Sequence, residues 1–186
     1  MKPVEYRATA VPVLIDTPSV AYLMADGKGD PDGEAYKTAV EGLYQASYSV
    51  RAALKPVAAY TVGTLQGLWH GVGLDPDRSS WTWTMMIAQP PEATADVVTA
   101  ALAAVRTPRP GLALVRREVF DEGECAQILH TGPYADEGPT HARLMEFIAA
   151  KGRVVRGSHH EIYLSDPRRV DPAKMRTILR YAVGIG

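Results

Sequence analysis

The hydrophobic and polar positions of the chain first follow the order strand, helix, strand, strand. Residues 20–26 form a short apolar run that predicts a strand, and the turn-forming stretch G-K-G-D-P-D-G closes it. From Glu34 to Leu54 apolar residues recur every three or four positions, which predicts an amphipathic helix ended by Pro56. Two runs rich in aromatic and β-branched residues follow, separated by a turn at 71–80, and they predict two strands.

The second half of the chain repeats this order. The segment A-Y-L-M-A-D-G-K-G-D-P-D-G from Ala21 aligns without a gap with A-Q-I-L-H-T-G-P-Y-A-D-E-G from Ala126, an offset of 126 − 21 = 105 residues. A second helical stripe at 144–149 and two further strands follow this segment. The aligned pairs that are identical or alike in type are Ala21/Ala126, Leu23/Ile128, Gly27/Gly132, Asp32/Glu137 and Gly33/Gly138. We therefore predict an internal duplication.

The repeated order predicts an α+β fold made of two tandem βαββ units. We expect residues 1–186 to form one domain, with the first unit at 19–88, a linker helix and turn at 89–111, and the second unit at 112–186. Duplicated antiparallel units usually pair about a pseudo-twofold axis, with helices on one face of the sheets. The other face is then free to form a groove, so we expect a central ligand cleft at the junction.

Two of the predicted strands have one face of unusual chemistry. In H-H-E-I-Y-L the period of two puts Glu161 on one face with His159 and Tyr163, and the opposite, apolar face is expected to meet the helices. In W-T-W-T-M-M-I the same period makes one face strongly aromatic. The residues of that face are Trp81, Trp83, Met85 and Ile87. Tryptophans on strands most often serve core or cross-strand packing, so a structural role remains the alternative for each of them.

Three environments are open for Glu161. It is solvated, paired with a buried cation, or poised for a ligand. Arg168, Arg169 and Arg180 are the candidate partners for an ion pair, because a buried carboxylate is costly unless a cation compensates it. A carboxylate without such a partner suits general acid or base chemistry.

Composition and charge exclude several classes of function. Lys and Arg number 20 and Asp and Glu 21, a formal net charge of −1, so no positive field favours a phosphate backbone. The single cysteine, Cys125, is expected to be a core thiol. His159 and His160 are adjacent on a strand and point to opposite faces, so no metal site is predicted. No apolar leader or run of about 18 apolar residues occurs. We expect a cytoplasmic protein that needs no cofactor and binds neither nucleic acid nor membrane.

Six stretches that span nearly the whole chain in order resemble a known family. They are P-V-L-I-D-T-P-S-V-A-Y-L-M-A-D-G-K-G-D-P from Pro12, A-Y-K-T-A-V-E-G-L-Y from Ala35, L-Q-G-L-W from Leu65, W-T-W-T-M-M-I-A-Q-P from Trp81, Q-I-L-H-T-G-P-Y from Gln127 and H-H-E-I-Y-L-S-D-P-R-R from His159. The chain resembles the GyrI-like small-molecule-binding proteins, relatives of the effector domains of multidrug-sensing regulators, and above all their stand-alone bacterial branch. The resemblance implies two SHS2-type βαββ units around a cleft for flat, hydrophobic and often cationic aromatic molecules.

The resemblance also implies a function. Some stand-alone relatives hydrolyse the cyclopropane ring of cyclopropanoid DNA-alkylating compounds, a detoxifying reaction. Here Glu161 would orient and deprotonate the water, and Tyr134, or else Tyr163 or His130, would donate a hydrogen bond to the oxygen that gains charge. The further ligand-binding residues expected are Trp69, Trp81, Trp83, Tyr60 and Gln66. The family pattern has glutamate at Gln66 and tryptophan at His70, and this chain departs from it at both. The alternative is a non-catalytic module that sequesters or senses cationic aromatic drugs, with a protein partner left open.

Overall fold

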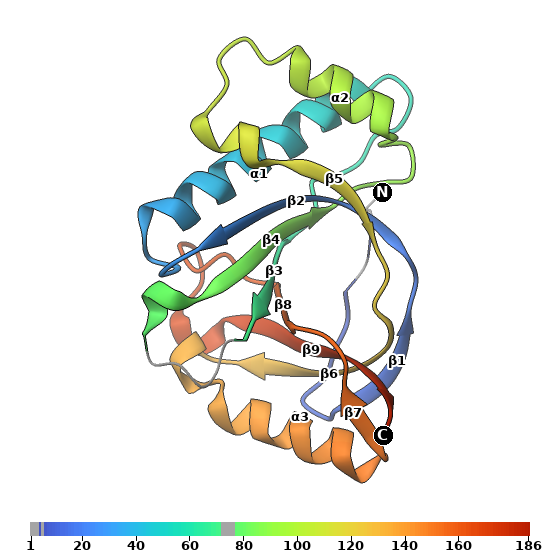
Figure 1. Cartoon of the computed structure of the whole chain (residues 1–186), viewed down its shortest axis with the longest axis vertical. Helices are drawn as coiled ribbons and strands as arrows, with labels where there is room; N and C mark the ends of the chain where they lie inside the picture. The colour runs from blue at the N-terminus through green and yellow to red at the C-terminus, as the bar shows by residue number, and fades with distance from the viewer. Residues whose placement is uncertain (1–3, 5, 72–76) are drawn as a thin grey trace. The chain divides into compact units, whose positions relative to one another are not determined.

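The computed structural model describes residues 4, 6–71 and 77–186 (Figure 1). The chain divides into two compact units, which we call unit 1 and unit 2. Unit 1 comprises Met1–Glu5 and Val20–Phe120, and unit 2 comprises Tyr6–Ser19 and Asp121–Gly186. Residues 72–76 of the turn predicted at 71–80 lie outside the described residues. No helix in the described part of the chain is both long and apolar enough to cross a membrane.

Unit 1 is an antiparallel sheet with helices packed on one face. Within it the strands follow the order β3-β4-β2-β5. The long helix α1 ends two residues before Pro56, as the sequence predicts, and its buried positions recur at the expected spacing. The elements are β2 (Val20–Lys28), α1 (Glu34–Leu54), β3 (Leu65–His70), η1 (Arg78–Ser80), β4 (Thr82–Ala88), α2 (Ala95–Ala103), η2 (Pro110–Leu114) and β5 (Arg116–Phe120).

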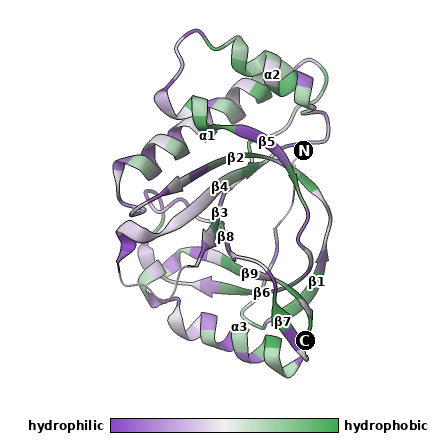
Figure 2. Cartoon of the chain, viewed as in Figure 1, coloured by the Kyte–Doolittle hydropathy of each residue, from purple (hydrophilic) through white to green (hydrophobic). Residues whose placement is uncertain are grey.

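Unit 2 has the same kind of sheet with one helix. Its strands follow the order β1-β6-β9-β8, all antiparallel, and β7 pairs separately with β9. The helix α3 packs against β6 and β7, and hydrophilic and hydrophobic residues alternate around it (Figure 2). The elements are β1 (Val13–Thr17), β6 (Gly123–Thr131), η3 (Tyr134–Asp136), α3 (Gly138–Ala150), β7 (Arg153–Val155), β8 (His159–Tyr163), η4 (Pro172–Lys174) and β9 (Arg176–Ile185).

The α+β class predicted from the sequence is confirmed, and the two units are alike in topology. In each unit a strand, a helix and two more strands of the sheet follow one another, with the short β7 inserted after α3 in unit 2, and the last of these strands lies between the other two. The edge strands are exchanged, because β5 precedes β6 in the chain but pairs with β2, while β1 precedes β2 but pairs with β6. This likeness supports the proposed internal duplication. The repeat boundaries expected from the sequence stay a prediction.

The face of β8 that meets the helix differs from the expectation. Glu161 lies directly opposite Leu179 of β9, and Leu179 packs in one core with Leu144 of α3. Side chains opposite one another on paired strands share a face, so Glu161 lies on the helix face. The prediction that the apolar side of this strand meets the helices is wrong. Strand periodicity assigns sides only relative to each other, and the other side is buried in its own right: His160 is 0% exposed and bonded to Glu122.

Candidate functional site

Glu161 ends an apolar row of the unit 2 sheet. Ile128 of β6 pairs with Leu179 of β9, and Leu179 pairs with Glu161 of β8. The first two residues of this row are fully buried in the core beneath α3. The Glu161 side chain keeps 14% of its surface exposed. The strand therefore places a carboxylate at the margin of a hydrophobic core, where solvation is poor and a charge is felt strongly by its neighbours.

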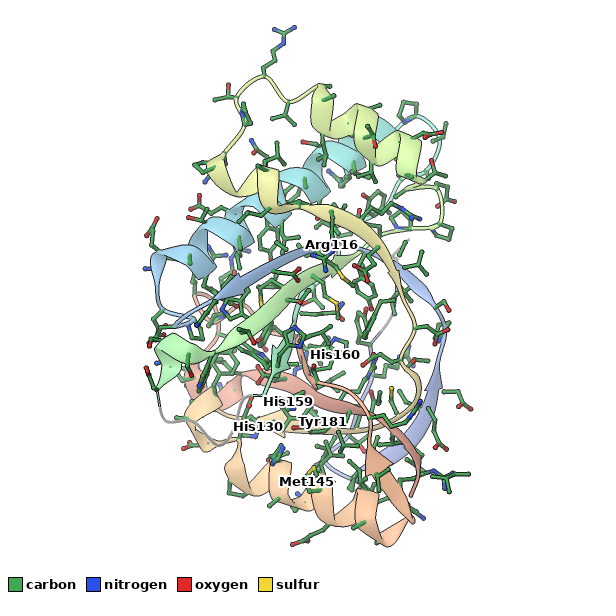
Figure 3. All side chains as sticks on the ribbon, viewed as in Figure 1. Arg116, His130, Met145, His159, His160 and Tyr181 are labelled. Atoms are coloured by element: carbon green, nitrogen blue, oxygen red, sulfur yellow. The ribbon has the colours of Figure 1, made fainter. Side chains whose placement is uncertain are left out.

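The described partner of the Glu161 carboxylate is an imidazole. His159 Nε2 lies 3.2 Å from Glu161 Oε1, and the His159 side chain is 12% exposed. The ring of His159 also lies 5.0 Å from the ring of Tyr181 and 5.6 Å from that of His141. Figure 3 labels His159 and Tyr181, which come from neighbouring strands. The second ring nitrogen, His159 Nδ1, is buried without a hydrogen-bond partner among the described residues. One imidazole thus holds the acid in place.

The arginines considered as partners of Glu161 bind other carboxylates. Arg180 Nη1 lies 3.1 Å from Glu122 Oε2, in a pair that is nearly fully buried. The nearest nitrogens of Arg168 and Arg169 lie 3.0 Å and 3.6 Å from the carboxylate of Asp166. The structure therefore gives no support to the alternative in which one of these arginines neutralises Glu161.

A second carboxyl group, which sequence reasoning did not select, lies close to Glu161. Glu137 stands at the cap position before α3, and its Oε1 atom is buried without a hydrogen-bond partner in the described part of the chain. Ligand-type atoms of Glu137, His159 and Glu161 all lie within 4.8 Å of one another. Burial and then the negative charge of Glu161 raise the pKa of Glu137 to about 9. These are the residues that could hold a metal ion, because two carboxylates and an imidazole suit a divalent cation.

Tyr134 and Tyr181 lie close enough to Glu161 for its charge to act on their hydroxyls. The ring of Tyr134 meets that of Tyr163 edge to face at 5.7 Å, and Tyr134 keeps 42% of its surface exposed. Burial and then the charge of Glu161 raise the pKa of Tyr134 to about 12 and that of Tyr181 to about 12. Tyr181 also shares a hydrogen bond of 2.9 Å with His141 Nε2. Because their pKa values are raised, both tyrosines keep their protons at neutral pH and can donate hydrogen bonds.

His130 fixes the loop that carries Tyr134 and Glu137. Its Nε2 donates to the carbonyl oxygen of Pro133 at 3.1 Å, so in the neutral ring Nδ1 accepts from the Thr140 hydroxyl at 3.0 Å. The residue is 4% exposed and lies on β6 beside α3 (Figure 3). Since both ring nitrogens are engaged, this geometry favours a positioning role over direct contact with a ligand.

The tryptophans proposed as ligand contacts form a packed cluster in unit 1. Trp69 and Trp83 face one another on β3 and β4 and are 6% and 1% exposed. Trp81 meets Trp69 edge to face at 5.9 Å. Tyr36 of α1, which the sequence did not single out, stacks on Trp69 at 6.3 Å and meets Trp83 edge to face at 5.3 Å. The shared face predicted for Trp81 and Trp83 is confirmed, since both pack in the core beneath α1.

Tyr60 and Gln66 lie elsewhere in unit 1. Tyr60 is 5% exposed and its hydroxyl donates to Gln89 Oε1 at 3.2 Å. Burial raises the pKa of Tyr60 to about 12. Gln66 is 0% exposed and pairs with Met86, a residue of the core on the opposite face of the sheet. The structure therefore joins Tyr60 to the tryptophan core but separates Gln66 from it.

Comparison with known proteins identifies the family. A sequence profile described as the GyrI-like small molecule binding domain matches residues 80–182, more than half of the chain. This chain belongs to the GyrI-like family. The resemblance expected from the sequence is thereby confirmed. Among curated proteins there is no match to this GyrI-like chain.

Solved structures agree with this assignment. An uncharacterized conserved protein from Listeria innocua is 38% identical with a TM-score of 0.90, and the match covers 96% of this chain and 95% of that chain. A hydrolase from Listeria innocua is 37% identical with a TM-score of 0.86, covering 96% and 94%. The EcmrR C-terminal domain is 13% identical with a TM-score of 0.61, covering 94% and 98%, which shows a shared fold alone.

Proposed function

We propose that this GyrI-like protein binds planar, hydrophobic aromatic xenobiotics and hydrolyses the cyclopropane ring of cyclopropanoid DNA-alkylating compounds. The observation that carries the proposal is the carboxylate of Glu161, which lies on a core margin beside an imidazole, while the three candidate arginines bind other carboxylates. A relative of 37% identity is a hydrolase, which supports the class of reaction. The substrate class comes from the resemblance to the stand-alone bacterial branch. The reaction would protect the cell by destroying the alkylating group.

The chemistry requires a water molecule aimed at the strained carbon. Glu161 orients this water and takes its proton, while the His159 imidazole, 3.2 Å from Glu161 Oε1, fixes the carboxylate. The bond from water oxygen to ring carbon forms as the cyclopropane carbon–carbon bond breaks, and the electron pair moves to the dienone oxygen. The ligand becomes aromatic, which supplies driving force. The ring of Tyr134 remains 42% exposed, and stacking on such a ring adds about 0.5 to 1.5 kcal/mol.

The test is mass spectrometry of a cyclopropanoid alkylator incubated with the protein. We expect a product heavier by one water, and we expect Glu161→Gln to lower the rate by about 100- to 10,000-fold. Binding, followed by quenching of tryptophan fluorescence, should persist in this variant because the amide has nearly the same shape. The exposed residue Glu146 of α3 provides the matched control, and Glu146→Gln should turn over normally. An alkylator left intact by the wild-type protein, or full turnover by Glu161→Gln, would exclude the mechanism.

The alternative is a non-catalytic module that sequesters or senses cationic aromatic drugs. The negative charge of Glu161 among tyrosine rings favours this reading, since both attract a delocalised cation. In that case the ligand is recovered unchanged while quenching saturates. Glu161→Gln should then weaken binding of a cationic dye more than that of a neutral dye of the same shape. Equal weakening of both would speak against charge recognition.

A further inference from the structure

We propose that Tyr181 and His141 are positioning residues, whose rings hold the imidazole of His159 in the one orientation from which it fixes the carboxylate of Glu161. The role rests on the hydrolysis proposed above, in which Glu161 takes the proton of the attacking water. Neither Tyr181 of β9 nor His141 of α3 was singled out from the sequence. Both act on the acid through His159.

Hydrogen bonding alone leaves the orientation of the His159 ring open. Its Nε2 lies 3.2 Å from Glu161 Oε1, and its Nδ1 is buried without a hydrogen-bond partner among the described residues. Where a histidine serves in catalysis or binds a metal, a partner at the second ring nitrogen usually sets the orientation of the ring. A ring held at one nitrogen can turn about its bond to Cβ, and a half turn would present a carbon to the carboxylate. Packing must therefore prevent this turn.

Two aromatic rings from other elements confine the His159 ring. The centroid of the Tyr181 ring lies 5.0 Å from that of His159, with the planes tilted by 40°. The ring of His141 meets that of His159 edge to face, at 5.6 Å and 81°. Both separations fall within the range of about 4.5 to 7 Å in which aromatic rings attract one another. Because one contact is tilted and the other is edge to face, a turn of the His159 ring would alter both.

Strand register and one hydrogen bond bring the three rings together. The strands β8 and β9 pair so that His160 lies opposite Arg180, and the same register carries His159 to the place beside Tyr181 (Figure 3). The Tyr181 hydroxyl shares a hydrogen bond of 2.9 Å with His141 Nε2, and these two rings lie 5.7 Å apart. Each ring thus contacts the other two, and α3 is tied to the strand that carries the acid.

The orientation of the acid matters because the reaction depends on where the water is held. A general base must lie within hydrogen-bond reach of the proton that it takes. A misplacement of about 1 Å can lower the rate about 100-fold. Ligand binding should depend less on this orientation, because the stacking ring of Tyr134 belongs to η3. Loss of a positioning ring should therefore lower kcat and change KM little.

The first test removes the ring of Tyr181. We expect Tyr181→Leu to lower kcat about 10- to 100-fold with KM nearly constant. Tyr181→Phe keeps the ring and loses the hydrogen bond to His141, so it should lower kcat only about 2- to 5-fold. Phe147→Leu is the matched control, since Phe147 packs on the same core as Tyr181 while its ring lies against Lys151. An unchanged kcat in Tyr181→Leu, or an equal loss in Phe147→Leu, would overturn the role.

Double variants test whether the two rings act through His159. In a His159→Ala protein there is no imidazole left to orient, so adding Tyr181→Leu should lower kcat no further. A merely structural role would instead multiply the two losses, and that result would contradict the proposal. His141→Leu, at a half-buried position of α3, should show the same loss and the same lack of additivity. It decides the question should Tyr181→Leu fail to fold.

Crystal structures of the wild type and the variants separate this role from the hydrolysis itself. We expect His159 Nε2 to keep its contact with Glu161 Oε1 in the wild type and in Tyr181→Phe. In Tyr181→Leu the ring should leave this position or occupy it only in part. If this contrast holds but the wild type leaves the alkylator intact, the hydrolysis is excluded and the positioning of Glu161 stands. A His159 ring that keeps its place in Tyr181→Leu would overturn the role, with or without turnover by the wild type.

Discussion

The helix faces of the two units share a topology and differ in chemistry. In each sheet one row crosses three strands beneath the helix, and its first two residues are apolar and buried. The rows are Leu23, Ile87 and Leu65 in unit 1 and Ile128, Leu179 and Glu161 in unit 2. Leu65 and Glu161 therefore occupy corresponding places. One row ends in a leucine that packs on the core, and the other ends in an acid.

This difference indicates that the helix face of unit 1 serves stability and that of unit 2 serves chemistry. Unit 1 completes its helix face with indole and phenol rings, and Trp83 is 1% exposed. Unit 2 leaves Glu137 Oε1 and His159 Nδ1 buried without partners among the described residues. Such atoms are rare in folded proteins because each one costs desolvation free energy. Unit 1 keeps its helix face apolar and unit 2 does not at the corresponding place, which indicates that the buried polar groups of unit 2 serve function.

The largest effect, on turnover, is expected when Glu161 of unit 2 is replaced by leucine, the residue found at the corresponding Leu65 of unit 1. Glu161→Leu removes the base, so turnover should fall by about 100- to 10,000-fold. The free energy of unfolding should stay constant or increase, because an apolar side chain extends the apolar row of Leu179 and removes a poorly compensated charge. Mass spectrometry and urea unfolding check the two expectations. Leu65→Met, a volume-conserving change in unit 1, is the control and should alter neither by much. A loss of several kcal/mol in Glu161→Leu would show that the acid is structural.

Truncation of the unit 1 cluster should act on stability. Trp83→Ala removes an indole that meets Tyr36 at 5.3 Å and donates to the Gly29 carbonyl at 3.1 Å. We expect a loss of about 3 to 5 kcal/mol in the free energy of unfolding, measured with urea. Tyr48→Ala is the aromatic control, since Tyr48 is 56% exposed on α1, and it should cost less than about 1 kcal/mol. If Trp83→Ala also cost less than about 1 kcal/mol, the indole would not contribute to the core.

A smaller effect is expected where β2 makes room for this indole. A Cβ at Gly27 would overlap the ring of Trp83, so Gly27→Ala should destabilise the protein by about 1 to 3 kcal/mol. Gly138 is the matched control because a Cβ there meets nothing within 4 Å. Gly138→Ala at the start of α3 should be neutral or stabilise by up to about 1 kcal/mol. Equal outcomes for the two glycines would remove close packing as the reason for Gly27.

The sequence predicts the central elements and misses the edges. The helix Glu34–Leu54 was predictable because its apolar period continues over 21 residues. The strands β1, β5 and β7 were not predicted. The first two, Val13–Thr17 and Arg116–Phe120, are short, pair on one side only and are largely polar or exposed, so they lack a clear alternation.

The site was predictable to a lesser degree. Glu161 was found because a carboxylate interrupts an alternating strand. Glu137 lies at the cap position between η3 and α3, and periodicity says nothing about the burial of a residue outside strands and helices. The only signal for it is the repeat alignment, in which Glu137 corresponds to Asp32. The depth at which each acid lies depends on packing that no local pattern encodes.

The smallest effect on stability is expected from changing Asp32, the residue of unit 1 that corresponds to Glu137. The Asp32 side chain is 84% exposed and lies 3.1 Å from Arg78 Nη2, and the same nitrogen binds Asp30 at 3.0 Å. An exposed ion pair contributes about 0 to 1 kcal/mol, so Asp32→Asn should cost less than about 1 kcal/mol. It should also leave the pH dependence of unfolding unchanged.

The matched change in unit 2 should behave differently. The pKa of Glu137 is raised from 4.5 to about 9 in the folded protein, so the free energy of unfolding should decrease as pH rises between these values. The decrease is at most about 1.4 kcal/mol per pH unit because a single proton is involved, and Glu137→Gln should remove it. Urea unfolding of both variants at several pH values below about 9 measures the contrast. Should Asp32→Asn flatten the pH dependence as much as Glu137→Gln does, burial would not be what distinguishes the two acids. If only Glu137→Gln changes the pH dependence of unfolding, the same position of the repeat carries an exposed, charged carboxylate in unit 1 and a buried, protonated carboxyl group in unit 2.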